Sequence, residues 1–421
     1  MRTEEFWVLD EDDREVVARL TPGLGEDAAR VLAYLLLRSA VEEGPATELA
    51  LRIGTGLNRN AIASAVDRLE SAGVVDRTAV RDDGPGRPPT AWRARSTLDA
   101  SPTEVYRHHA GALLDRAAER FGTEEGAPDD RDEQDERLTL GLNWRPNGLH
   151  LPFYAGHEGY DEFGVEVDVE HREGSHRALD ALVSGESDVG LVGAATVLRA
   201  RAAGEAVVPI AVVYQRAMAV LYTVRERFGE PLTGVDQLRD RRVGMPARSE
   251  TRVLGRLFLS QVAPDGGVRI VDTAGEEQDA LLSGEVDVVT GSFSDPRRLE
   301  RRGMTVDTLA VADRFPIYGP TLVVREGTLS ARRSALEGFL AGTTAGWAEA
   351  RLDPTPAAER VAARSSGSVD RAVRTFEVAS REFGGSDAVR EHGWGWQREE
   401  TWERLRAALD QGSLLSGPGS A

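Results

Sequence analysis

The chain contains no cysteine and no lysine, and all 51 of its basic residues are arginine. Without cysteine it has no disulfide, no thiolate metal site and no cysteine nucleophile. Without lysine it has neither a Schiff-base residue nor the lysine of a phosphate-binding P-loop. No run of about eighteen apolar residues is present, so we expect no membrane-spanning helix and no membrane partner.

The size and charge of the chain set broad limits on its organisation. Its 421 residues are too many for one hydrophobic core, so we expect two or three domains. The net charge of −19 is explained by an acidic, soluble surface and needs no particular partner. The first residues are acidic and lack a basic region followed by an apolar stretch, so we expect a cytoplasmic protein.

Residues 26–96 follow the order helix, helix, helix, β-hairpin. Helices are predicted over 26–41, 46–54 and 58–72, and the third carries an apolar stripe of Ile62, Val66 and Leu69. Two strands are predicted over 74–80 and 90–96, on either side of a turn rich in Gly and Pro. This order is typical of a winged helix-turn-helix DNA-binding domain.

The charge of this region supports the same interpretation. Residues 52–95 hold eight arginines and five acidic residues, a balance of +3 within an acidic chain. The stretches LNRNAIASAVDRLESAGVVDRT and GPGRPPTAWRA resemble the recognition helix and wing of archaeal and bacterial winged-helix regulators. Arg and Asn suit bidentate contacts with base edges of double-stranded DNA. The expected DNA-contacting residues are Asn58, Arg59, Asn60, Ser64, Arg68 and Arg87. The alternative is a module that binds another protein.

A further helix is predicted over 102–121, before the acidic linker 122–136. We expect its apolar stripe to pair with a second chain, because such DNA readers usually work as two-fold dimers. The adjacent residues His108 and His109 point about 100° apart on a helix, so we expect no metal site there. We expect no other cofactor either. The predicted boundaries are an extension over 1–25, a DNA-binding domain over 26–96, a helix and linker over 97–137, and a ligand domain over 138–411.

The second half of the chain alternates strand-like and helical runs, which predicts an α/β protein. ALDALVSGESDVGLVG at 178–193 is echoed by EQDALLSGEVDVVTGS at 277–292. The repeat predicts two similar lobes, with the strand ends at 193–196 and 291–294 facing one cleft. We expect the connections near 208–224 and 314–324 to act as hinges.

Three stretches of this half resemble a known family: LNWRPNGLHLPFYAGHEGYDEFGVEVDV, SGESDVGLVGAATVL and FLAGTTAGWAEARLDPTPAAERV. They are similar to the thiamine-pyrimidine family, which has a two-lobed fold like type II periplasmic binding proteins. That family includes hydroxymethylpyrimidine-binding proteins of ABC transporters and pyrimidine-precursor synthases, and it adjoins sulfonate-binding proteins. Its opening phrase is matched by Trp144, Pro146, Asn147 and His150. The synthases use a lysine and a cysteine-rich motif, both absent here, so we expect no catalytic residue and no enzyme.

The resemblance implies a ligand site between the lobes. Trp144 offers a flat face to a pyrimidine ring, and Asn147 and His150 offer hydrogen bonds. Backbone N–H groups at Thr196 are suited to an anion, because a helix is expected to begin there. The full set of candidates is Trp144, Asn147, His150, Thr196, Arg248, Ser249, Ser292, Asp295 and Tyr318. For each, the alternative is a structural role in a turn, a helix cap or the core.

Together these observations predict a ligand-responsive, DNA-binding transcriptional regulator. Its expected effector is a thiamine pyrimidine precursor or the phosphate of one. One alternative is a sensor of a sulfonate or another small anion. Another is a synthase-like enzyme or a transporter-associated binding protein.

Overall fold

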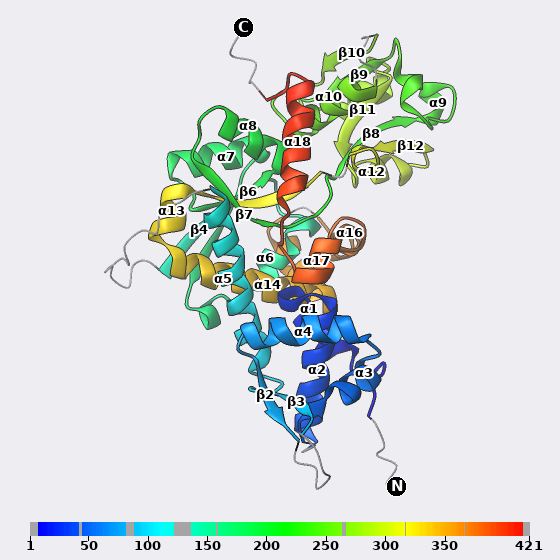
Figure 1. Ribbon diagram of the computed structural model, residues 1–421. Coiled ribbons are helices and arrows are strands. Elements are labelled where there is room, and N and C mark those ends of the chain that lie inside the picture. Colours follow the sequence, from blue (N-terminus) through cyan, green and yellow to red (C-terminus); the bar gives the residue numbers. More distant parts are fainter. Residues whose placement is uncertain are drawn as a thin grey trace.

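The computed structural model describes residues 7–41, 44–80, 88–121, 136–156, 159–262, 267–315, 317–365 and 367–415. The chain forms an N-terminal helical unit followed by two lobes, each built on a five-stranded sheet (Figure 1). No helix within the described ranges is long and apolar enough to cross a membrane.

The N-terminal unit has the element order expected for residues 26–96. Its helix α4 starts after Asn58, whose side chain accepts the N–H groups of Asn60 and Ala61 at 3.0 Å. Ile62 and Val66 of α4 are buried, and α4 packs against α2. The strands form a small antiparallel sheet in the order β1-β3-β2. The elements are α1 (Arg14–Leu24), α2 (Glu26–Ala40), β1 (Ala46–Thr47), α3 (Glu48–Thr55), α4 (Arg59–Ser71), β2 (Val75–Ala79) and β3 (Thr90–Ala94).

Two helices depart from the sequence-based expectations. Helix α1 is more than an extension, because it packs against α2, α5 (Ser101–Phe121) and α14 (Arg333–Leu352). The apolar stripe of α5 was expected to face a second chain, but it packs against α14, α1 and β7 of the same chain. A stripe covered in this way is not free to form a dimer interface. The N-terminal unit and the first lobe consequently share one apolar core.

The first lobe contains a sheet in the order β5-β4-β6-β13-β7, in which β13 runs antiparallel to its neighbours. Its strands are β4 (Arg137–Leu142), β5 (Glu166–His171), β6 (Val189–Gly193), β7 (Val207–Val212) and β13 (Pro320–Arg325). Its helices are α6 (Leu151–Ala155), α7 (Ser175–Ser184), α8 (Ala194–Ala202), α13 (Glu326–Ala331) and α14.

The second lobe repeats this plan with the order β10-β9-β11-β8-β12, in which β8 is the antiparallel strand. Strands β6 and β11, which end the repeated sequences, occupy the same place in their sheets. The strands are β8 (Ala219–Val224), β9 (Arg242–Met245), β10 (Arg269–Asp272), β11 (Val288–Ser292) and β12 (Val306–Ala310). The helices are α9 (Arg225–Phe228), α10 (Glu250–Val262), α11 (Glu277–Ser283) and α12 (Pro296–Glu300).

The lobes are joined by two crossing segments, one between β7 and β8 and one between β12 and β13, and by the C-terminal region. The crossings lie side by side, because Ala217 N–H donates to Ile317 O at 2.8 Å and Gly319 N–H donates to Tyr214 O at 3.0 Å. Helix α18 runs beside α8 and near α10 (Figure 1). An apolar cluster formed by α18, α10 and the start of α8 therefore packs the two lobes together. The C-terminal helices are α15 (Thr355–Ala363), α16 (Val369–Glu382), α17 (Asp387–His392) and α18 (Glu399–Gln411).

Candidate functional site

The lobes meet where β6 ends and α8 begins. Helix α8 follows Gly193 directly, so its first N–H groups have no partner within the helix. Glu250, the first residue of α10 in the other lobe, supplies one. Ala195 N–H donates to Glu250 Oε1 at 3.1 Å and Thr196 N–H donates to Oε2 at 3.2 Å. The Thr196 hydroxyl donates to the same Oε2. A carboxylate from one lobe is thus held by three donors of the other.

Further charged groups lie at this contact between the lobes. Arg248 contacts the ring of His176, which lies on α7 of the first lobe. Arg199 follows Thr196 by one turn of α8, and its Nε is buried without a hydrogen-bond partner among the described residues. We call Thr196, Arg199, His176, Arg248 and Glu250 the interlobe junction. It brings amide donors and two arginines close to the Glu250 carboxylate, and a second carboxylate, that of Asp180, lies 3.5 Å from His176 Nε2.

The protonation of the junction reflects its enclosure. Burial raises the pKa of the Glu250 carboxyl, against the opposing effects of the Thr196 hydroxyl, the two amides and Arg199. Burial lowers the pKa of His176, and Asp180 opposes that shift. Arg248 has φ 54°, a left-handed conformation that costs a non-glycine residue about 1–3 kcal/mol. A residue with left-handed backbone and a desolvated carboxyl therefore lie two positions apart at this contact.

Three residues predicted from the sequence lie at this place: Thr196, Arg248 and Ser249. The Ser249 hydroxyl accepts the N–H of Arg252 at 3.0 Å and donates to Pro246 O at 2.9 Å, so it caps α10. Glu250 was missed. In the sequence it is an acidic residue in the first turn of a helix, and only the fold reveals that it reaches the other lobe.

The stretch WRPNGLH, residues 144–150, forms a turn after β4 that is held by hydrogen bonds. Asn147 Oδ1 accepts the N–H of Leu149 at 2.9 Å, and its amide donates to Arg145 O at 2.8 Å. The Asn147 side chain is therefore engaged in stabilising the turn. Trp144 is 54% exposed, which leaves its ring open to a partner.

His150 is buried behind this turn. Its Nδ1 has no hydrogen-bond partner among the described residues, and its Nε2 lies 3.4 Å from Asn143 Oδ1. Burial, together with the neighbouring His171, lowers the pKa of His150 to about 3, so the ring is neutral. His171 Nδ1–H donates to Trp144 O at 2.6 Å, which leaves its Nε2 to accept the Tyr154 hydroxyl at 2.7 Å.

The remaining ligand candidates are occupied by local contacts. The Asp295 carboxylate accepts the N–H of Ser292 at 2.7 Å, and burial raises the pKa of this carboxyl. Tyr318 is buried against Trp402, with ring centroids 5.3 Å apart, and its hydroxyl accepts the N–H of Arg398 at 2.7 Å. Tyr318 thus belongs to the core beside α18 and offers no free edge to a ligand.

The expected DNA-contacting residues have mixed surroundings. Asn58 caps α4, and Arg59 forms an exposed ion pair with Glu48 at 3.2 Å. Asn60 and Ser64 are exposed on α4, and Arg87 lies outside the described residues. The positive surface expected here is reduced, because other arginines of the unit pair with acidic residues. These pairs are Arg77 with Glu70, Arg93 with Asp76 and Arg95 with Asp76.

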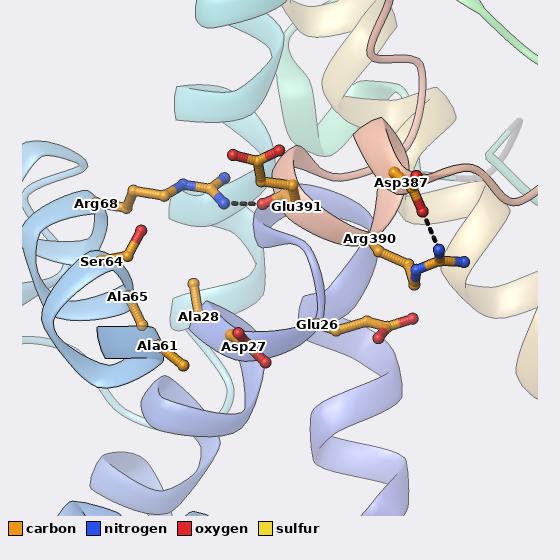
Figure 2. A pocket seen from close by; sticks show the side chains of 10 residues that line it. All are labelled: Glu26, Asp27, Ala28, Ala61, Ser64, Ala65, Arg68, Asp387, Arg390 and Glu391. Carbon is orange, nitrogen blue, oxygen red and sulfur yellow. Dashed lines mark hydrogen bonds and ion pairs between the residues drawn. The ribbon is translucent and has the colours of Figure 1, made fainter. Parts of the chain in front are cut away.

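Arg68 has a different partner. Its guanidinium donates to the backbone oxygen of Glu391 in α17, at the rim of a hollow of about 290 Å³ between α2, α4 and α17 (Figure 2). Burial lowers the pKa of Arg68. The hollow is lined by four carboxylates and two arginines, those of Glu26, Asp27, Asp387, Glu391, Arg68 and Arg390, so it is acidic and unsuited to an anion. Within the described ranges, no group of three His, Asp or Glu side chains is arranged to hold a metal ion.

Comparisons with known proteins extend these observations. The family model described as NMT1/THI5 like matches residues 147–357. No curated protein matches the chain. Among solved structures, the Candida albicans CA3427 gene product has 16% identity and a TM-score of 0.52, covering 67% of this chain and 91% of that one.

Two bacterial binding proteins are similar to the same extent. The periplasmic aliphatic sulphonate binding protein SsuA from Escherichia coli has 14% identity and a TM-score of 0.52, covering 67% of this chain and 94% of that one. A ligand-binding component of an ABC-type import system from Staphylococcus aureus, solved with zinc bound, has 14% identity and a TM-score of 0.51, with the same coverage. At these identities the likeness concerns the fold alone.

The expected two-lobed α/β architecture is confirmed by these matches together with the two sheets. The family match begins at residue 147 and leaves the N-terminal unit outside it. The winged-helix interpretation of residues 26–96 therefore stays a prediction. The chain belongs to the NMT1/THI5-like family, and its two lobes have the fold of periplasmic binding proteins.

Proposed function

We propose that the two lobes form a receptor for a small organic anion, a sulfonate or a comparable acid, bound at the interlobe junction. The observation that carries this proposal is the Glu250 carboxylate, which marks a place where three donors of the first lobe converge on anionic oxygens. Arg199 adds positive charge there, and charge-assisted hydrogen bonds are the stronger ones. The role is one of binding rather than catalysis.

We favour a sulfonate as the ligand over the pyrimidine precursor expected from the sequence. The Escherichia coli relative is described as binding aliphatic sulphonates. A pyrimidine would instead use the exposed ring of Trp144, while His150 behind it is buried and Asn147 is engaged in its turn. The anion site is supported by more groups than the pyrimidine site.

Thermal unfolding and calorimetric titration with two ligand series test this choice. One series contains alkanesulfonates and carboxylates; the other contains hydroxymethylpyrimidine, its phosphate and thiamine. A ligand at a hundred times its dissociation constant adds about 2.7 kcal/mol to the free energy of unfolding. We expect the acids to stabilise the protein. Stabilisation by the neutral pyrimidine alone would contradict the anion receptor.

A second candidate function is DNA binding by the N-terminal unit, with the ligand as effector. It is favoured by the exposure of Asn60 on a capped helix that is followed by a β-hairpin, whereas Ser64 lines the acidic hollow beside α17. Two copies on half-sites about ten base pairs apart would form the regulator expected from the sequence.

Selection of bound fragments from random duplex DNA, with and without the organic acid, tests this second function. We expect the double substitution of Arg59 and Asn60 by alanine to abolish any enrichment. If the native chain retains no DNA in either condition, the protein is a ligand receptor that does not bind DNA.

A further inference from the structure

Glu250 lies where the anionic group of a ligand is expected. We propose that Glu250 is a built-in occupant of the α8 N-terminus, and that a ligand binds by displacing its carboxylate with an oxyanion of its own. The inference rests on the proposed receptor function. It adds the ligand class that the site selects and the internal competitor that the ligand has to overcome.

The fit of the carboxylate is close. A Cβ atom on Gly193 would lie 2.3 Å from Glu250 Cδ, so only glycine leaves room for the carboxyl group at the end of β6. Both carboxylate oxygens are engaged by Ala195 and Thr196. Glu250 is therefore oriented toward the first lobe as a bound anion, and it is not oriented to receive a cationic ligand.

This occupancy has an energetic cost that a ligand can exploit. Burial raises the pKa of the Glu250 carboxyl, which means that the enclosed charge is less well solvated than in water. The buried Nε of Arg199, nearby on α8, still lacks a hydrogen-bond partner among the described residues. The two oxygens of the Glu250 carboxylate engage the amides and the Thr196 hydroxyl, and the third oxygen of an external oxyanion would be available to Arg199.

The displaced side chain has a second favourable position. Glu250 is the first residue of α10, a helix of 13 residues, and an acidic group in a first turn is stabilised by the positive end of its own helix dipole. Glu250 thus has two alternatives, the N-terminus of α8 across the junction or that of α10. Movement between them would exchange an internal anion for an external one without leaving either helix end uncompensated.

This arrangement predicts that the site selects anions over neutral molecules. A neutral molecule does not replace the charge that the α8 amides lose when Glu250 leaves, whereas a sulfonate or phosphate does. Because Glu250 links the lobes, its displacement transfers the interlobe contact to the ligand. The ligand then becomes part of the surface that joins the two lobes.

Calorimetric titration of the full chain with methanesulfonate tests the proposal, with neutral dimethyl sulfone as the matched probe. The variant Glu250→Ala empties the site, and Glu250→Gln keeps the side-chain shape without the charge. Glu226→Ala is the control, because it removes an exposed acidic residue from the same lobe. Circular dichroism verifies that each variant is folded, and Glu250→Gln serves if the alanine variant is not.

We expect Glu250→Ala to bind methanesulfonate at least about tenfold more tightly than the native chain, whereas Glu226→Ala matches the native chain. Dimethyl sulfone should show no gain in any variant. Unchanged or weaker binding by both Glu250 variants, with the native chain still binding methanesulfonate, overturns the internal occupant and leaves the receptor function intact. Absence of binding by every variant overturns both.

Discussion

The two lobes carry the same repeated sequence but complete it differently. In the first lobe, β6 ends at Gly193, and the N–H groups that follow bind the carboxylate of Glu250 from the other lobe. In the second, β11 ends with Gly291 and Ser292, and the N–H of Ser292 binds the carboxylate of Asp295, three residues further on. In both places a Cβ on the glycine would collide with the carboxylate.

This difference indicates which lobe holds the anion. The second lobe satisfies its strand end from its own loop, and the following helix α12 spans only five residues. The first lobe continues into the nine-residue α8 and depends on a group from outside the lobe. Both repeated strands therefore end in N–H groups that bind a carboxylate. Only in the first lobe does that carboxylate come from the other lobe, where a ligand can replace it.

The largest effect is expected from bulk at the two glycines. Gly193→Val should expel Glu250 and cost about 1–3 kcal/mol of unfolding free energy, since overpacking forces neighbouring groups apart. It should also separate the lobes, raising the radius of gyration measured by small-angle scattering. Gly291→Val should destabilise the second lobe by a similar amount without changing the radius of gyration. Equal scattering from both variants would remove the distinction between the ends.

The pH dependence of the unfolding free energy should report on both carboxylates, with a smaller effect than the glycine substitutions. The pKa of Glu250 and that of Asp295 are raised, so the native state binds a proton more tightly than the unfolded chain. Stability due to each group therefore falls as pH rises from the ordinary carboxyl pKa through the raised one.

Both Glu250→Gln and Asp295→Asn should flatten this slope in urea unfolding measured across pH. Only Glu250→Gln should also strengthen methanesulfonate binding. A slope that neither substitution changes would mean that these carboxyls do not set the pH dependence.

The smallest effect is expected from Thr196→Val, which removes the hydroxyl that donates to Glu250. Loss of one hydrogen bond to a charged group costs about 1.5–3 kcal/mol when it leaves a buried partner, and less when the partner can move. Because Glu250 has an alternative position, we expect a loss of about 1 kcal/mol. In the Glu250→Ala background the loss should vanish in a double-mutant cycle. A loss of equal size in both backgrounds would place the hydroxyl outside this contact.

Much of the two-lobed fold was predictable from the sequence. The repeated motif predicted two lobes, and its strands β6 and β11 take equivalent places in the sheets. Strand β12 has little signal in the sequence, because Val306–Ala310 is a short, partly exposed edge strand with a weak apolar pattern. The expected pairing of α5 with a second chain was wrong, because its apolar stripe packs against α14. The sequence does not reveal this contact, since α14 lies more than two hundred residues away.

The site was less predictable than the fold. Thr196 and Arg248 could be placed near a strand end, since ligands in α/β proteins bind at the carboxyl ends of strands. Glu250 had no sequence signal beyond that of a helix start, and its partner lies across the junction. Likewise, arginines of the N-terminal unit gave a positive count, but their pairing with Glu70 and Asp76 depends on the hairpin geometry.

The most direct test is a titration of the isotope-labelled chain with methanesulfonate, followed through its backbone amide resonances. If the ligand replaces Glu250, the amides of Ala195 and Thr196 should shift most, and the side-chain carboxyl carbon of Glu250 should shift with the same midpoint. The amide of Ser292, closed by its own Asp295, should stay nearly unchanged. Shifts centred on Ser292, or binding that leaves Ala195, Thr196 and Glu250 unmoved, would contradict the account.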